Sequence, residues 1–345
     1  MEKPIKISKG FGMEESLRSY FLKAGYYVSR GVPFRYDNFD ITDIDLWLYH
    51  RTSPFSREVS IVDIKNKKTP QAIERIFWAQ GLKSAIKANN AIVATTDRRR
   101  EVTDFGRDLG IVVLDGSFLS RLDKLDNLLG ERLTEEEFTS LVQSYVLEKM
   151  DGGWISRMRL CKSLLASDLG FDGCNEWLFH LGFFMEQAVI KPQQREIASR
   201  CYFLILSYLA ITVDYLLKEI LFLEQSTRIQ LLRDGFTFGD RGKAGMEQIL
   251  DVTMNLVEQH AENGTSISSQ VKSSIRRSLA TNNSAILAEH LSKNDVARCL
   301  FQVAVELESA AMSRRFVELA SLGIESRSFV LCIADYFGVE RSRLL

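Results

Sequence analysis

The sequence predicts an α/β domain, a mixed sheet flanked by helices, followed by an all-helical C-terminal domain. With 345 residues, 46% of them hydrophobic, the chain has enough apolar material for two cores. Strand-like and helical patterns alternate up to about residue 122, and from about residue 134 long helical patterns take over. We therefore predict one domain at residues 1–127 and a second at residues 131–345.

The first half has the predicted order α-β-β-β-α-β-α-β. Residues 14–24 place apolar side chains at helical spacing, and Gly25 follows where a helix end favours a left-handed residue. Runs rich in apolar, β-branched and aromatic residues predict strands at residues 26–29, 41–49, 59–64, 91–95 and 111–114. Two further helical patterns lie between them, at residues 71–88 and 100–109. This order predicts a mixed sheet with helices on its faces.

The second half is predicted to be helical throughout. Its long helical patterns lie at residues 135–150, 193–225, 243–261, 267–279 and 295–322. The most apolar run, residues 201–217, contains Asp214 and is shorter than the roughly 20 apolar residues that a spanning helix needs. We therefore expect a buried helix and no membrane partner.

Charge and cysteine content exclude several classes of protein. Residues 1–120 carry 19 basic and 15 acidic side chains, a net charge of +4, and the rest of the chain carries −5, so an anionic partner is expected on the first half. Five cysteines without a CxxC pair predict neither a zinc knuckle nor a fully paired disulfide framework.

The N-terminal lysines precede no apolar run of a secretory signal, and we expect a cytoplasmic protein. Dispersed histidines and the absence of a GxSxG motif give hydrolases with a Ser or Cys nucleophile little support.

Charged side chains alternate at the ends of two consecutive predicted strands. Asp43 and Asp45 leave one face of the first strand about 7 Å apart, and Asp63 and Lys65 do the same on the next. Paired strands would bring these faces together. Two carboxylates suit a hard divalent cation such as Mg²⁺, with Mn²⁺ as a substitute, and a nearby ammonium can orient a water that attacks phosphorus. Asp63 also lies in an otherwise apolar run, which distinguishes it from an ordinary solvated charge.

This pattern resembles the motif of the PD-(D/E)xK nuclease superfamily, in its Mrr-type and Holliday-junction-resolvase-like branches. The first aspartate of the motif falls on Asp45, and the (D/E)xK triplet falls on residues 63–65, Asp-Ile-Lys. Ile44 stands where the motif has proline, which leaves open whether Asp43 or Asp45 is the primary ligand. We favour Asp45.

The resemblance covers residues 9–122 and includes elements on both sides of the motif. Glu14 lies in the opening helix about eleven positions before Gly25, where relatives often carry a glutamate that joins the metal site. Residues 90–97 and 110–116 resemble the Mrr-type segments that close the catalytic core.

The resemblance implies a restriction-endonuclease-like fold and a metal-dependent endonuclease that hydrolyses phosphodiester bonds in DNA, in restriction, defence or DNA processing. The catalytic residues that it implies are Glu14, Asp45, Asp63 and Lys65. Its metal ligands are Asp45, Asp63, Glu14 and the carbonyl of Ile64, and Lys65 positions the attacking water. Two alternatives stay open: a non-catalytic module with this fold that binds nucleic acid or protein, and a nuclease directed at RNA.

Supporting residues follow from charge and position. Lys67 and Lys68 come directly after the triplet, and Arg98 and Arg99 follow the strand at residues 91–95, so we expect phosphate contacts from them. Gln80 is the candidate for a substrate-orienting polar residue, because it lies on the helix after the triplet. We expect Trp47 and Trp78 to be core residues and not base-stacking platforms.

The helical half, with its negative net charge, is expected to place the substrate, to form a homo-oligomer or to bind another protein.

Overall fold

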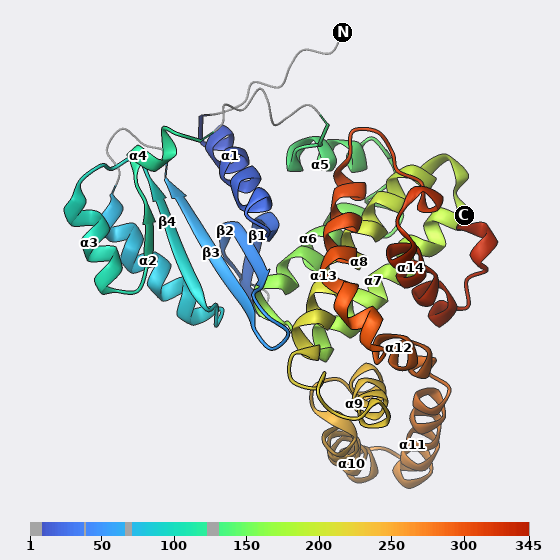
Figure 1. Cartoon of the computed structure of the whole chain (residues 1–345). Helices are drawn as coiled ribbons and strands as arrows, with labels where there is room; N and C mark the ends of the chain where they lie inside the picture. The colour runs from blue at the N-terminus through green and yellow to red at the C-terminus, as the bar shows by residue number, and fades with distance from the viewer. Residues whose placement is uncertain (1–8, 38, 66–70, 123–130, 345) are drawn as a thin grey trace.

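A computed structural model describes residues 9–37, 39–65, 71–122 and 131–344 of the chain. Figure 1 shows a sheet with its helices in the first part of the chain and a larger set of helices in the rest. The elements of the first part are α1 (Lys9–Lys23), β1 (Tyr27–Tyr36), β2 (Phe39–Arg51), β3 (Arg57–Lys65), α2 (Ala72–Ala85), β4 (Asn90–Thr95), α3 (Arg100–Asp108), β5 (Val112–Leu114) and α4 (Gly116–Leu119). Apart from the short α4, this is the predicted order, and an α/β part followed by a helical part is confirmed.

The five strands form one mixed sheet in the order β1-β2-β3-β4-β5. The first three strands are antiparallel neighbours, whereas β4 pairs in parallel with β3 and β5. Strand β1 is longer than predicted and continues through Gly31 and Pro33. Glycine and proline usually interrupt a strand, but β1 lies at the edge of the sheet, where a proline breaks no ladder on its outer side.

Helices cover the two faces of the sheet. On one face, Leu17 and Phe21 of α1 pack with Leu46, Val62 and other strand residues. Helix α1 ends in a Schellman motif, in which Tyr26 N–H bonds to Phe21 C=O and Gly25 N–H to Leu22 C=O, each at 3.0 Å. Gly25 has φ +89°, which confirms the predicted left-handed position.

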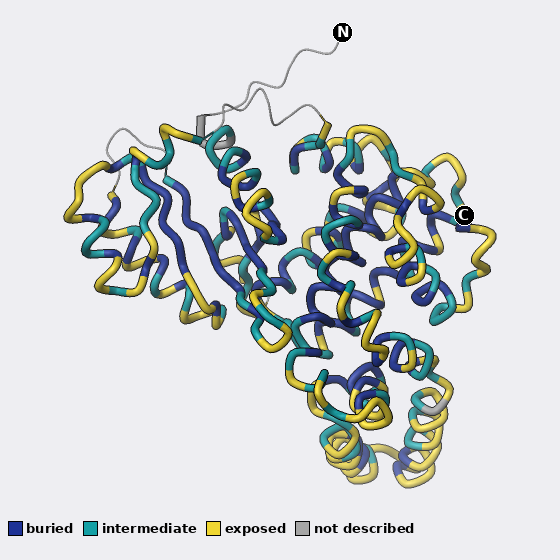
Figure 2. The backbone as a smooth tube through the Cα atoms, viewed as in Figure 1, coloured by how far each residue is buried: buried dark blue, intermediate teal, exposed yellow. Residues whose placement is uncertain are grey.

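On the other face of the sheet, one apolar cluster runs from the strands into the helical half. Trp47 and Val93 pack there with Ile76 of α2, and the same cluster continues through Leu165 and Phe203. Figure 2 shows buried backbone along the strands and in the middle of the helical half. The two halves therefore share a core, and the independent folding of residues 1–127 and 131–345 stays a prediction.

The helical half has more and shorter helices than the sequence patterns predicted. They are α5 (Glu135–Gln143), α6 (Trp154–Ser167), α7 (Phe171–Ile190), α8 (Arg195–Leu217), α9 (Gln225–Phe238), α10 (Gly242–His260), α11 (Gly264–Ala280), α12 (Ser284–Leu291), α13 (Asn294–Met312) and α14 (Ile324–Phe337). The stretches predicted at 135–150, 193–225 and 295–322 were too long, because helical spacing of apolar residues continues through the turns at their ends.

Helix α8 is the buried helix expected from the apolar run. Within the described part of the chain, the segment Pro192–Leu217 is the one helix long and apolar enough to cross a membrane, and 89% of its most apolar window is buried in the protein. Its Asp214 is fully buried and accepts hydrogen bonds at 2.6 Å from Tyr49 Oη and from Arg57 Nε. Arg51 lies 3.2 Å from the same carboxylate. The charge within the apolar run is therefore neutralised by side chains of β2 and β3.

Candidate active site

The β2–β3 ladder brings the two predicted aspartates together. The last pair of the antiparallel ladder is Leu46 with Val62. Continuing this register places Asp45, the residue before Leu46, opposite Asp63, the residue after Val62. Asp45 Oδ2 accepts a hydrogen bond from the backbone N–H of Ile64 at 2.6 Å. Because side chains alternate along a strand, Asp45, Asp63 and Lys65 share one face of the sheet.

Burial raises the pKa of Asp45. The hydrogen bond from Ile64 N–H and the positive charges of Arg75 and Lys65 oppose this effect, while Asp43 adds to it. The same interactions show that Asp45 has cations from β3 and α2 in its electrostatic surroundings. Asp43 is exposed and lines a cavity of about 400 Å³ between the sheet and the helical half. Asp45, half-buried and bonded to β3, is the better placed of the two carboxylates.

Glu14 reaches this region from α1. Arg30 Nε of β1 lies 3.1 Å from its carboxylate. Nevertheless the pKa of Glu14 is raised to about 7, because burial, together with repulsion from Asp45, Glu136 and Glu15, outweighs the attraction of Arg30. Asp45 is thus within electrostatic reach of Glu14, whose ion-pair partner is Arg30.

Arg75 is a residue of this site that the sequence did not single out. Its Nε donates a hydrogen bond to Asp63 Oδ2 at 2.7 Å, and its second terminal nitrogen forms an ion pair with Asp63 Oδ1. Asp63 is only 7% exposed. In the sequence Arg75 is only a basic residue near the start of a predicted helix, and a solvated arginine would look the same.

The supporting residues have mixed outcomes. Lys65 at the end of β3 pairs with Thr95 at the end of β4. Arg98 and Arg99 come shortly after Thr95, so they lie near the same end of the sheet as Lys65. Arg99 donates hydrogen bonds to both oxygens of Asp97, the shortest at 2.7 Å, and lowers the pKa of that carboxyl. Arg98 is exposed. Their predicted phosphate contacts stay predictions.

Lys67 and Lys68 lie outside the described residues. Gln80 is half-buried on α2, and its buried Oε1 has no hydrogen-bond partner within the described residues. Trp47 is a core residue as predicted, with no exposed surface, but the core prediction for Trp78 was wrong, because its side chain is 43% exposed. The buried residues in this part of α2 are Ile76 and Ala79. The helical period therefore places Trp78 on the side of α2 that faces solvent.

Carboxylate oxygens at this end of the sheet are the donor type that a hard divalent cation prefers. Within the described ranges, no group of three or more His, Cys, Asp or Glu side chains is gathered closely enough to hold a metal by itself. Mg²⁺ is commonly bound by one or two carboxylates, with water and substrate phosphates completing its ligands. Asp45 and Asp63 are the two carboxylates here that could hold such a cation, whereas Glu14 is not gathered with them into a three-carboxylate group. Half-buried carboxylates with raised pKa values gain from a neighbouring cation.

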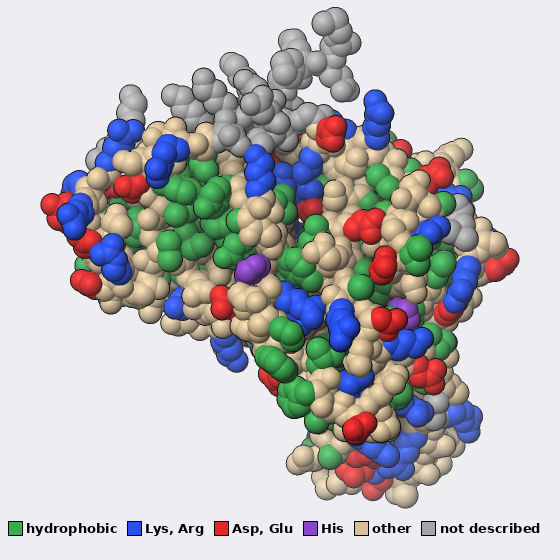
Figure 3. Space-filling view, viewed as in Figure 1, with side chains coloured by type: hydrophobic (Ala, Val, Ile, Leu, Met, Phe, Trp, Pro, Cys, Tyr) green, Lys and Arg blue, Asp and Glu red, His purple; other side chains and the backbone are tan. Residues whose placement is uncertain are grey.

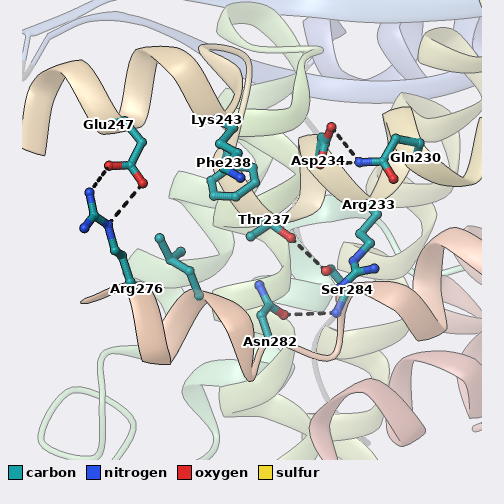
Figure 4. A pocket seen from close by; sticks show the side chains of 11 residues that line it. Gln230, Arg233, Asp234, Thr237, Phe238, Lys243, Glu247, Arg276, Asn282 and Ser284 are labelled. Carbon is teal, nitrogen blue, oxygen red and sulfur yellow. Dashed lines mark hydrogen bonds and ion pairs between the residues drawn. The ribbon is translucent and has the colours of Figure 1, made fainter. Parts of the chain in front are cut away.

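Another cavity lies in the helical half, away from these carboxylates. Its volume is about 580 Å³, and helices α9 to α12 enclose it. Figure 4 shows the Glu247–Arg276 ion pair, 2.7 Å long, on one side of this cavity and Arg233 on the opposite side. Figure 3 shows acidic and basic side chains interspersed over the visible face of the molecule. The cavity contains none of the predicted site residues.

The chain was compared with protein-family models, with curated proteins and with solved structures, and nothing matches in any of the three. The assignment of a function therefore rests on the site itself.

Proposed function

We propose that this chain is a divalent-cation-dependent nuclease with a restriction-endonuclease-like N-terminal domain of the PD-(D/E)xK type, acting on DNA. The observation that carries the proposal is the β2–β3 register, which sets Asp45 opposite Asp63 with Lys65 on the same face. The net charge of +4 over residues 1–120 supports an anionic substrate.

Each residue has one role in the proposed reaction. Asp45, Asp63, the Ile64 carbonyl and Glu14 hold the cation, which when bound neutralises charge that develops on the phosphoryl oxygens. The ammonium of Lys65 donates a hydrogen bond that orients the attacking water. Attack on phosphorus then expels the 3′ oxygen and leaves a 5′ phosphate, a polarity that comes from the family resemblance.

A second candidate function is a non-catalytic nucleic-acid-binding module with the same fold. The Arg75–Asp63 ion pair favours it, because Asp63 already has a counter-ion from the chain itself. Lys65 separates the two functions more sharply than the carboxylates do. Removing a carboxylate weakens both cation binding and cation-bridged substrate binding, whereas Lys65 is needed only for the chemical step.

The test is cleavage of plasmid, linear and branched DNA, single-stranded DNA and structured RNA, with Mg²⁺, Mn²⁺ or EDTA. We expect cleavage of DNA that EDTA abolishes. Under single-turnover conditions Lys65→Ala should lower the rate about 10²- to 10⁴-fold and leave cation binding largely intact. Lys65→Arg should also be slow, because a broad guanidinium does not replace a compact ammonium beside a water.

The matched control is Lys83→Ala, which removes a lysine from the last turn of α2. It should cleave at the wild-type rate. Equal rates for wild type and Lys65→Ala would refute the proposed mechanism. Binding of DNA without cleavage of any substrate would support the non-catalytic module, and preference for RNA would change the substrate class.

A further inference from the structure

The carboxylate of Asp63 is fully engaged by a side chain of the protein itself. Arg75 contacts both of its oxygens, through Nε at 2.7 Å and through the second terminal nitrogen. A guanidinium fork that matches both oxygens of a carboxylate is the strongest form of a side-chain ion pair. The Asp63 side chain is 7% exposed, so this pair is only weakly screened by water.

Arg75 lies at the boundary between the buried carboxylates and solvent. Its side chain is 24% exposed, and its guanidinium lies 5.8 Å from the centre of the Trp78 ring. Trp78 is one turn further along α2 and is itself 43% exposed. The guanidinium therefore has Asp63 on its inner side and an open surface with an aromatic ring on its outer side.

A divalent cation and Arg75 compete for Asp63. A cation at Asp45 and Asp63 needs an oxygen of Asp63 that Arg75 now occupies, and two positive groups a few ångströms apart repel each other. We propose that Arg75 is the internal counter-ion of Asp63, and that a divalent cation displaces its guanidinium, which then binds a phosphate group of the nucleic acid. This inference rests on the proposed function, since it assumes a cation at Asp63.

The guanidinium is suited to that second partner. Its planar fork fits a phosphate as well as a carboxylate, and a rotation of the long side chain moves it towards solvent without any change in α2. The exchange would give the guanidinium an anionic partner in both states. Before the cation binds, Arg75 is the ion-pair partner of Asp63. Afterwards it is the ion-pair partner of the substrate phosphate.

The first measurement is calorimetric titration with Mn²⁺ in the absence of nucleic acid. Arg75→Met removes the charge and keeps a side chain of similar reach, and it should bind Mn²⁺ on the order of 10- to 100-fold more tightly than wild type. Arg75→Lys keeps the charge but loses the fork, and it should lie between the two. Arg75→Lys also keeps the inference testable if Arg75→Met does not fold. The control Arg107→Met removes an exposed arginine of α3, paired with Asp104, and should bind Mn²⁺ as wild type does.

The second measurement is binding of a duplex oligonucleotide, with the Lys65→Ala background in every protein so that the duplex is not cleaved. With Mn²⁺ present, Arg75→Met should bind the duplex about 3- to 10-fold more weakly than its background. With EDTA the two affinities should be equal within about twofold. A residue with a merely structural role would not strengthen cation binding and weaken cation-dependent binding of nucleic acid at the same time.

The outcomes separate this inference from the proposed function. If wild type binds Mn²⁺ and both Arg75 variants bind it equally well, the inference is wrong and the cation site stands. If neither wild type nor any Arg75 variant binds Mn²⁺, the cation site itself is refuted. Binding of Mn²⁺ by Arg75→Met but not by wild type would support the inference in its strongest form.

Discussion

Asp214 should be one of the most costly residues to replace in this chain. Its carboxylate has no exposed surface and lies on α8, yet its partners Tyr49, Arg51 and Arg57 come from β2 and β3, up to 165 residues away in sequence. The Arg57 side chain is also fully buried. Removing the carboxylate leaves a buried guanidinium without a counter-ion in a core that both halves share.

The magnitude follows from this burial. Breaking a buried ion pair by removing one partner typically costs about 3–5 kcal/mol, and we expect Asp214→Ala to lower the free energy of unfolding by that amount. Asp214→Asn should cost less, because the amide oxygen can still accept one hydrogen bond from Arg57. Replacing Asp214 together with Arg57, as in Asp214→Leu with Arg57→Met, should recover part of the loss, because the fully buried Arg57 charge is then removed as well, while Tyr49 and Arg51 still lose their acceptor.

The assay is urea unfolding followed by far-ultraviolet circular dichroism, analysed as a two-state transition where its shape allows. Asp251→Ala is the matched control: Asp251 pairs with Lys272 at 3.0 Å, but its side chain is 57% exposed. An exposed pair contributes at most about 1 kcal/mol. If Asp214→Ala cost no more than Asp251→Ala, the ion pair between the halves would not stabilise the fold as we argue.

Two further predictions concern the carboxylates of the candidate site. Asp45→Ala and Asp63→Ala should each lose Mn²⁺ binding in calorimetry while staying folded, and unchanged affinity in both would refute the site. Glu14 has a pKa of about 7 in the folded protein and about 4.5 when unfolded, so the folded state binds more protons between these values. Its contribution to stability therefore falls as pH rises from about 4.5 to 7. The thermal midpoint of wild type relative to Glu14→Gln should fall across that window, and a constant difference would contradict the assigned pKa.

The β2–β3 part of the site could be predicted because strands have a simple period. Side chains alternate between faces, so the spacing of Asp63 and Lys65 places them on one face whatever the rest of the chain does. Two consecutive strands with a short connection pair as antiparallel neighbours, which brings Asp45 to Asp63. The alternation of side chains and the pairing of consecutive strands both depend on residues close together in the sequence, so both can be predicted from it.

The rest depends on contacts that no local pattern contains. The helical spacing of residues 71–88 predicts a helix, but it does not say that Arg75 faces Asp63 or that Trp78 faces solvent. Strand β1 continues past Pro33 because it is an edge strand, and a position in the sheet is a tertiary property. Asp214 reads as an interruption of an apolar helix until its partners on β2 and β3 are known.

Arg30 shows why the two halves cannot be understood one at a time. This buried arginine of β1 contacts Glu14 at 3.1 Å and Glu15 at 2.7 Å on α1, and it also forms an ion pair with Glu136 on α5. One guanidinium thus shares its charge among three carboxylates, two from the sheet part and one from the helical part. Glu136 also raises the pKa of Glu14 directly. The helical half therefore acts on the charge of a candidate metal ligand through Arg30 and Glu136, so any shift of α5 relative to β1 changes how readily Glu14 ionises.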